Sequence, residues 1–223
     1  MFCEKGWTVV QRRSNGSEDF KRDWVEYKEG FGNFTGEFWL GNDKLQLLTK
    51  APSVLLVELK NRNGDEAFAV YNTFQVRVTT NGTYRLLADN YYGTAGDALG
   101  KLNEALFSAH DRDNDDDNSE NCAGKLNSAW WYKKCDTLAA ISVDLNGNYT
   151  SGMHWLGWSE DHDITSVAMK IRPKQGKDYP RCLVALLRGD KQLDLSQFSN
   201  FRGLSSSLYV HTTNNIRQTS ATI

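Results

Sequence analysis

The sequence has little proline, no long apolar run and no strong net charge. Three prolines and 18 glycines among 223 residues argue against a collagen-like or proline-rich disordered chain. No apolar run approaches the roughly 20 residues of a membrane-spanning helix, so we expect no membrane insertion. A formal net charge of −2 gives no general attraction to nucleic acid, and we expect no nucleic-acid partner. The hydrophobic fraction of 39% is enough for one large domain, or one domain and a tail.

Motifs of the common enzyme classes are also missing. The four cysteines form no CxxC pair and fit no zinc-site spacing. There is no phosphate-binding loop, nucleophile elbow or zinc-protease motif. Acid–base chemistry by Asp111, Asp113 and Asp136 near His110 is the remaining enzymatic interpretation, and no motif supports it. We therefore expect a protein that is not an enzyme.

Four Asn-x-Ser/Thr sequons favour a secreted glycoprotein, because the sequon is a glycosylation signal only in the secretory pathway. They begin at Asn15, Asn33, Asn81 and Asn148. The N-terminus lacks the apolar segment of a signal peptide. For a secreted protein, we therefore expect that the true beginning of the chain precedes Met1.

Patterns of apolar residues predict strands in the first half of the chain and again near residue 170. The expected strands cover residues 6–12, 53–59, 67–78 and 167–171. Phe68, Val70, Phe74, Val76 and Val78 share one parity, so we expect them on one face. Asn63-Gly64 is typical of a hairpin turn between the second and third strands.

A short helix is expected over residues 17–30, where Phe20, Trp24 and Tyr27 fall on one face. Ser17 is its expected cap and Gly30 its end. Residues 45–48 form a short buried piece in this interpretation. From about residue 90 to 165 the pattern loosens, and a long irregular region inside a domain is usually functional.

An acidic segment over residues 111–135 is the most informative part of the chain. Asp111, Asp113 and Asp115 alternate, so their carboxylates could converge on a hard cation if the loop curls. The segment is not an EF-hand, because no glycine stands at the sixth position. A solvated acidic loop without an ion is the alternative. Trp130 and Trp131 follow it, and we expect them to serve packing more than ligand binding.

Several motifs, in the same order along the chain, resemble the fibrinogen C-terminal domain family, which includes ficolins, tachylectins, angiopoietins and tenascin ends. The motifs are Gly6–Arg13, Asp19-Phe20, Trp24, Tyr27–Gly32, Gly36–Gly41, Tyr84, Gly93–Asp97, Phe107-Ser108, Asp111–Asp115, Asn121–Ala123, Ala129–Tyr132, Leu145–Gly147 and Met169–Pro173. The resemblance implies an α+β fold, with a twisted, mainly antiparallel sheet, short helices and a loop-rich lobe for calcium and ligand. It covers residues 3–173 and lacks the first part of the family domain. Residues 174–223 are a tail of unknown structure.

The resemblance also implies a calcium site and a disulfide. Asp113 and Asp115 are the expected side-chain ligands of the ion. Two loop carbonyls complete the set: Asn118 and Glu120 by counting back from Cys122, or Asp117 and Ser119 by counting forward from Asp115. Cys122 and Cys135 are expected to form the disulfide of the lobe. Cys3 and Cys182 have no expected partner and could pair with each other or with another chain.

The ligand pocket departs from the family pattern. The resemblance assigns it to Leu126, Lys134, Asp136 and Tyr149, where family lectins use aromatic residues and a histidine to bind acetyl groups. An acetyl methyl needs an apolar cup, which Lys134 and Asp136 do not supply. We therefore expect weak binding of N-acetylated sugars.

Three functions remain open at this stage. The first is a secreted, calcium-binding recognition domain for a glycan or an extracellular protein surface, such as an innate-immune lectin. The second is a protein-binding or signalling module of the angiopoietin or tenascin type. The third is a partial or decayed family member that binds nothing. An oligomer through the missing N-terminal segment is possible in the first two.

Overall fold

The computed structural model describes residues 3–4, 6–135, 143–150, 152–158 and 164–174. All of them lie in one compact unit, Met1–Leu187, and a second unit, Arg188–Ile223, lies outside the described residues. The predicted tail therefore stays a prediction. Among the described residues, no helix is both long and apolar enough to cross a membrane.

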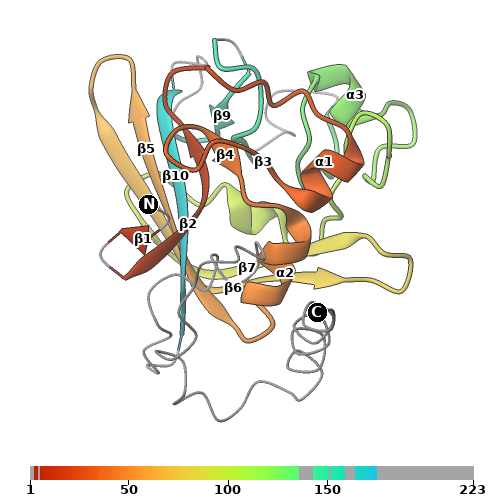
Figure 1. The fold of residues 1–223 in the computed structure, drawn as a ribbon, viewed down its shortest axis with the longest axis horizontal. Coiled ribbons are helices and arrows are strands. Elements are labelled where there is room, and N and C mark those ends of the chain that lie inside the picture. The colour runs from red at the N-terminus through yellow and green to blue at the C-terminus, as the bar shows by residue number, and fades with distance from the viewer. Residues whose placement is uncertain (1–2, 5, 136–142, 151, 159–163, 175–223) are drawn as a thin grey trace, which may run out of the picture. The chain divides into compact units, whose positions relative to one another are not determined.

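An antiparallel sheet forms the larger part of the described unit (Figure 1). Its strand order is β3-β4-β2-β10-β5-β6-β7, and β1 pairs with β2 beside this path. The strands are β1 (Cys3–Glu4), β2 (Trp7–Arg13), β3 (Phe31–Gly32), β4 (Phe38–Trp39), β5 (Ser53–Asn61), β6 (Glu66–Val78), β7 (Tyr84–Gly93) and β10 (Ile164–Pro173). A second sheet contains only β8 (Val143–Asp144) and β9 (His154–Trp155). With its short helices, this arrangement confirms the predicted α+β fold.

Strand β10 lies between β2 and β5, although it comes last in the described chain (Figure 1). It pairs with β5 from Ile164↔Asn61 to Pro173↔Ser53, and with β2 from Val167↔Arg13 to Ile171↔Thr8. The predicted strand over 167–171 was thus correct in place and too short. Pro173 ends it, as expected, because proline donates no ladder hydrogen bond.

The hairpin between β5 and β6 turns at the predicted residues. Gly64 has a φ of 88°, and its N–H donates to the Asn61 carbonyl at 3.1 Å. The expected single face of β6 was wrong, because the register shifts between Ser53 and Leu55 of the partner strand. One bulge exchanges the two faces of a strand. Ala67, Ala69 and Tyr71 are buried before the shift and Phe74 and Val76 after it, while Phe68 and Val78 are exposed. Val70 is also buried, although it shares the parity of Phe68.

Helix α1 spans only Trp24–Glu29, so the predicted start at Ser17 was wrong. Asp23 caps it, accepting from the Glu26 N–H, while the Glu26 carboxylate accepts from the Asp23 N–H. This reciprocal pair is a capping box. Ser17 cannot serve as the cap because residues 14–18 form a different turn, described below.

The remaining helices are short. Helix α2 spans Asn42–Leu48 and includes the piece expected at 45–48, but of that piece only Leu45 is buried, and Leu47 is 44% exposed. A 3-10 helix, η1, covers Leu99–Leu102, and α3 covers Cys122–Leu126. Asn121 caps α3 by accepting from the Gly124 N–H at 2.8 Å.

Aromatic side chains join the sheet to the following lobe. Trp130 and Trp131 have no exposed surface, which confirms the packing role expected for them. Their rings lie 5.2 Å apart, and the Trp131 ring is 5.0 Å from that of Phe107. Trp39 of β4 lies 6.3 and 6.1 Å from the two tryptophans. One continuous apolar core therefore supports both regions.

Candidate functional site

The acid loop, which we define as residues 111–120, is attached to the sheet region at its start. Asp111 Oδ1 accepts the N–H of Trp24, the first residue of α1, at 2.9 Å. The Arg112 guanidinium lies 4.2 Å from the centre of the Trp24 ring, and its Nη2 donates to the Asn81 carbonyl at 3.1 Å. These contacts fix the direction in which the acids that follow leave the core.

Successive aspartates then curl the loop, as the alternating pattern requires. Asp113 Oδ1 accepts from the Asp115 N–H at 3.2 Å, and Asp115 Oδ1 accepts from the Asp117 N–H at 2.8 Å. Asp117 Oδ1 continues the series with the Ser119 N–H at 3.0 Å. Each aspartate bonds its own backbone two residues on, which is an Asx-turn. The loop therefore curls within a few residues, with Asp113 exposed and Asp115 and Asp117 half-buried.

Asp113 and Asp115 are the pair that this curl brings together. The pKa of Asp115 is raised, first by burial and then by the Asp113 charge, although the N–H groups of Cys122 and Asp117 lower it. Two carboxylates in one place destabilise each other's charge, and a hard cation would remove that cost. The donor chemistry at these two residues therefore fits calcium.

The expected carbonyl donors lie further along the exposed loop. Asn118 and Glu120 are both exposed. The Glu120 carboxylate forms an ion pair with Lys125 at 2.5 Å, so its backbone carbonyl is the group left for a metal. In the other set, Ser119 donates its N–H and its hydroxyl to Asp117 Oδ1, at 3.0 and 2.6 Å. The contacts in the loop do not favour either set.

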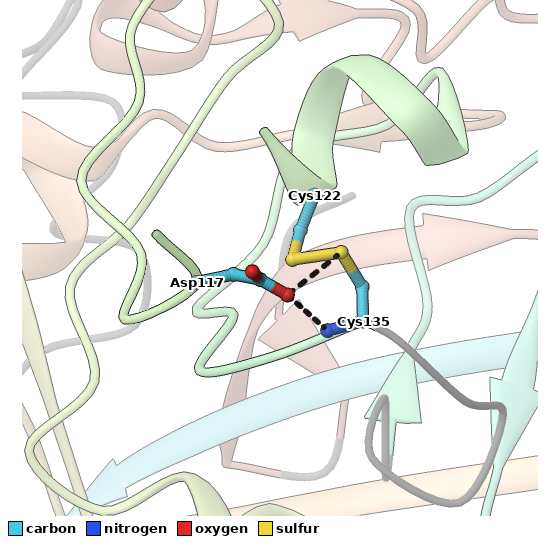
Figure 2. Close-up of side chains that lie close together, drawn as sticks. All are labelled: Asp117, Cys122 and Cys135. Carbon is cyan, nitrogen blue, oxygen red and sulfur yellow. Dashed lines mark hydrogen bonds between the residues drawn. A yellow bond between two sulfur atoms is a disulfide. The ribbon is translucent and has the colours of Figure 1, made fainter. Parts of the chain in front are cut away.

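The disulfide predicted between Cys122 and Cys135 is present, with their Cα atoms 5.5 Å apart. Figure 2 shows Asp117 facing this bond from the acid loop. Asp117 Oδ2 lies 3.5 Å from the Cys135 nitrogen and 4.0 Å from its sulfur, which carries no proton to donate. Because both sulfurs are used in the bond, these three residues are not a thiolate metal site. They join the acid loop to the disulfide instead.

Asp115 makes the second connection between the acid loop and the disulfide. Its Oδ2 accepts from the Cys122 N–H at 2.9 Å, at the start of α3. The two carboxyl oxygens of Asp115 thus hold both the curl of the loop and the first residue of the helix. A ligand that moves Asp115 would also act on α3.

The four predicted pocket residues have different surroundings. Leu126 ends α3 and packs half-buried on the core, while Lys134 is exposed beside Cys135. Asp136 lies outside the described residues. Tyr149 is held elsewhere, since its hydroxyl lies 3.0 Å from the Ser14 carbonyl and 2.9 Å from that of Thr165. Among the described contacts, none joins Tyr149 to Leu126 or Lys134.

A buried polar cluster around Asp144 was missed by sequence reasoning. Asp144 accepts from the Tyr132 hydroxyl at 2.6 Å, the Ser128 hydroxyl at 3.0 Å and the Asn146 N–H at 3.0 Å. Burial raises its pKa to about 6, although these donors and the Arg13 charge lower it. Leu145-Asn146-Gly147 matches a family motif, but nothing in the sequence marks the aspartate before it as buried.

A second missed feature is the Glu37 turn, which we define as residues 14–18 around the buried Glu37 carboxylate. Glu37 Oε1 accepts from the N–H groups of Ser14, Asn15 and Gly16 at 2.6, 2.9 and 2.9 Å, and Oε2 accepts from Glu18 at 3.0 Å. Burial raises the Glu37 pKa, but these backbone donors lower it more, so it lies below its ordinary value. Arg13 Nε lies 3.9 Å from the same carboxylate.

The chain is similar to known proteins over most of its length. The family described as fibrinogen beta and gamma chains, C-terminal globular domain, matches residues 2–174. Human fibroleukin is 41% identical over 196 residues, covering 77% of this chain and 43% of fibroleukin. Mouse angiopoietin-related protein 7 is 38% identical over 193 residues, covering 79% of this chain and 55% of that protein. The chain therefore spans about half the length of these curated relatives.

Solved structures of related domains have a similar fold. The fibrinogen-like globe domain of human ANGPTL6 superposes with a TM-score of 0.67 at 36% identity, covering 75% of this chain and 78% of that one. Lamprey fibrin D-dimer, in complex with the peptide Gly-His-Arg-Pro-amide, gives a TM-score of 0.66 at 30% identity, covering 82% of this chain and 67% of that one. The chain belongs to the fibrinogen C-terminal globular domain family.

Proposed function

We propose that this protein is a secreted, calcium-binding recognition domain whose partner is an extracellular protein or peptide. Fibrinogen-like domains are generally binding domains rather than enzymes. The observation that carries the proposal is the position of Asp115, which meets Asp113 on one side and the Cys122 N–H on the other. An ion at Asp113 and Asp115 would order the loop and, through Cys122, the helix beside the predicted pocket.

Calcium in this proposal is held by the carboxylates of Asp113 and Asp115 with carbonyls of Asn118 and Glu120, or of Asp117 and Ser119. The ion would supply positive charge among acids that otherwise repel. Asp115 then keeps both backbone hydrogen bonds without the cost of a neighbouring negative charge. The ion is structural here, because it acts on the shape of the loop.

A protein or peptide partner is favoured over an acetylated sugar. Lys134 is exposed, and the Tyr149 hydroxyl lies within hydrogen-bond distance of the Ser14 and Thr165 carbonyls. No described contact joins Tyr149 to Leu126. The acid loop carries six acids and one arginine, so its field attracts a basic segment of a partner. The peptide seen on lamprey fibrin D-dimer contains arginine and histidine, which makes it a suitable probe. Secretion is supported by the disulfide, which persists in oxidising compartments.

The calcium proposal is tested by thermal unfolding with and without the ion. Calcium should raise the melting temperature of the wild type, and Asp113→Asn with Asp115→Asn should abolish the rise. Asp116→Asn is the matched control, because it removes one charge from the same loop at an exposed position outside both ligand sets. A wild type with no calcium-dependent change would contradict the site, and so would an equal loss in the control.

The partner class is tested by binding measurements on the calcium-loaded protein. Gly-His-Arg-Pro-amide should bind, more weakly at high salt, while N-acetylglucosamine resin should not retain the protein. Losing two or three contacts at about 1 kcal/mol each reduces a millimolar sugar site below detection. Calcium-dependent retention on the resin, with elution by free acetylated sugar, would favour the lectin alternative. No binding of either probe would favour the partial or decayed family member.

A further inference from the structure

Four sequons lie in turns of the described chain, and their asparagines are all exposed. In Asn33 and Asn148 the side-chain oxygen accepts both the N–H and the hydroxyl of the threonine two residues on, at 2.8–3.0 Å. Asn15 Oδ1 accepts the Ser17 N–H at 3.1 Å. The oxygen end of each of these three carboxamides is thus bound within its own sequon, on an exposed turn where a bulky group can be carried.

Two of these turns meet at Glu37. The Asn15 N–H donates to the Glu37 carboxylate at 2.9 Å, and the Asn33 N–H donates to the Glu37 backbone carbonyl at 2.9 Å. Residues 33–36 close by a Gly36 N–H bond to the Asn33 carbonyl at 2.8 Å. Asn15 and Asn33 therefore each contact the same residue, although they are 18 positions apart in the chain.

The third turn joins them through Tyr149. This residue follows Asn148 directly, and its hydroxyl lies 3.0 Å from the Ser14 carbonyl. Its ring covers Gly16, where an added Cβ would lie 2.9 Å from Tyr149 Cδ1. Asn148 is thereby held beside the Glu37 turn, next to Asn15.

The fourth sequon has a different neighbour. The Asn81 carbonyl accepts from Arg112 of the acid loop at 3.1 Å. In this sequon the threonine, Thr83, is buried, and its hydroxyl is 2.6 Å from that of Thr79. Asn81 therefore serves as an internal comparison for the other three.

We propose that Asn15, Asn33 and Asn148 carry N-linked oligosaccharides that together cover the Glu37 turn. The inference rests on the secretion proposed above. In each transfer the asparagine Nδ2 forms a bond to the anomeric carbon of the first sugar. The bond from that carbon to the phosphate oxygen of a polyprenyl-pyrophosphate donor breaks. The nitrogen loses one proton, and the lipid pyrophosphate leaves with the electron pair.

The cover has a direct consequence for recognition. Three bulky, hydrated glycans exclude protein partners from the Glu37 turn. The acid loop lies beside Asn81 and outside this group of three, so it stays available unless Asn81 is also modified. The sequons thus restrict which surface of the domain a partner reaches.

Occupancy is tested on the full chain behind a heterologous signal peptide in eukaryotic cells. Enzymatic release of the glycans in ¹⁸O-water, followed by peptide mass spectrometry, marks every asparagine that carried one. Label is expected at Asn15, Asn33 and Asn148, and its absence at any of them would overturn the three-glycan cover. Because the added leader directs the chain into the pathway, this result is separate from whether the natural protein is secreted.

Proximity is tested by glycan processing. Crowded glycans are poorly accessible to processing enzymes, so Asn33→Gln should lower the endoglycosidase H-sensitive fraction at Asn15 and Asn148 severalfold. Asn81→Gln should leave both fractions unchanged. Equal effects of the two variants, or none in either, would refute the shared cover. Thr35→Ala removes the same glycan while keeping Asn33, and an intact 122–135 disulfide in every variant verifies folding.

Discussion

The sheet region and the loop-rich lobe are stabilised in different ways. The sheet, residues 7–93 with β10, is held by long antiparallel ladders whose register the backbone sets. The described residues of the lobe, 94–135, 143–150 and 152–158, form only short elements, and side chains hold them: the disulfide, the aspartate turns and the Asp144 cluster. A region held by a few specific side chains can change its loops between relatives while the sheet stays constant. We expect binding specificity to reside in the lobe for this reason.

Trp131 is where the two regions depend on each other. Its ring packs in the lobe against Trp130, and its Nε1 donates to the carbonyl of Tyr84 in β7 at 3.1 Å. The sheet region and the lobe are therefore not independent domains. Hydrogen exchange should distinguish substitutions that destabilise one region from substitutions that destabilise both.

The largest effect is expected for Trp131→Ala, which should destabilise the sheet region and the lobe together. Loss of a fully buried tryptophan costs about 3–5 kcal/mol of unfolding free energy. Because the ring supports lobe and sheet, hydrogen exchange should accelerate in β7 as well as in residues 107–135. Tyr92→Ala, at a position 52% exposed, is the control and should change little. Acceleration limited to the lobe would show that the sheet stands without it.

Removal of the disulfide should destabilise the lobe and leave the sheet region protected. Cys122→Ser with Cys135→Ser opens a loop whose closure is worth about 3 kcal/mol in the chain-entropy model. Hydrogen exchange should rise in the acid loop and α3, while β5, β6 and β10 keep their protection. An equal loss of protection from hydrogen exchange in those strands would show that the disulfide does not act on the lobe alone.

Asp144 should give the lobe a pH dependence of its own. A folded pKa of about 6, above the ordinary 3.8, means that unfolding free energy rises as pH falls from about 6 to about 4. The gain is about 2–3 kcal/mol at most. Denaturant unfolding across this range should show a larger rise in the wild type than in Asp144→Asn.

The comparison with Asp144→Asn is required because other groups lie near this carboxylate. Arg13, Tyr132 and Tyr27 interact with it electrostatically, and His154 is its partner in the β8–β9 ladder. Asp89→Asn, an exposed change of the same kind, should keep the wild-type slope. An unchanged slope in Asp144→Asn would assign the pH dependence to one of these neighbours.

The smallest effect is expected at Glu37, on the sheet side of the comparison. Glu37→Gln keeps an acceptor for the turn but loses the charge, at a cost of about 1–2 kcal/mol. The pKa of Glu37 lies below its ordinary 4.5, so its contribution is present above that pH and is lost as pH falls through the folded value. The difference in unfolding free energy between the wild type and Glu37→Gln should therefore be full above about pH 4.5 and should shrink as the pH falls below it, as measured by denaturant unfolding. Glu66→Gln, with a side chain 71% exposed, should match the wild type.

Local signals predicted the sheet better than the lobe. Alternating residues around Asn63-Gly64 identified β5, β6 and their turn, because those contacts are close in sequence. The bulge in β6 was missed, since one extra residue leaves no mark on composition. The start of α1 was misplaced because Ser17 is a good cap by residue type, whereas the N–H groups of Gly16 and Glu18 on either side of it donate to Glu37, 21 and 19 positions away.

Within the lobe, family resemblance identified what residue patterns alone left open. The pairing of Cys122 with Cys135 was confirmed, and Asp113 and Asp115 lie together as that site requires. Calcium itself stays a prediction. The Asp144 cluster could not be foreseen, because its donors come from residues 128, 132 and 146 and only the fold brings them together.

The central place of β10 has a consequence for synthesis. Translation delivers β2 early and β5 to β7 next, but the strand that joins β2 to β5 ends at Pro173. Until that residue has left the ribosome, both strands present an open edge, which is a template for wrong pairing. A nascent chain stopped before Ile164 would hold two unjoined pieces of sheet rather than a smaller version of the domain. The two edges therefore stay open for most of the time that the domain is being made.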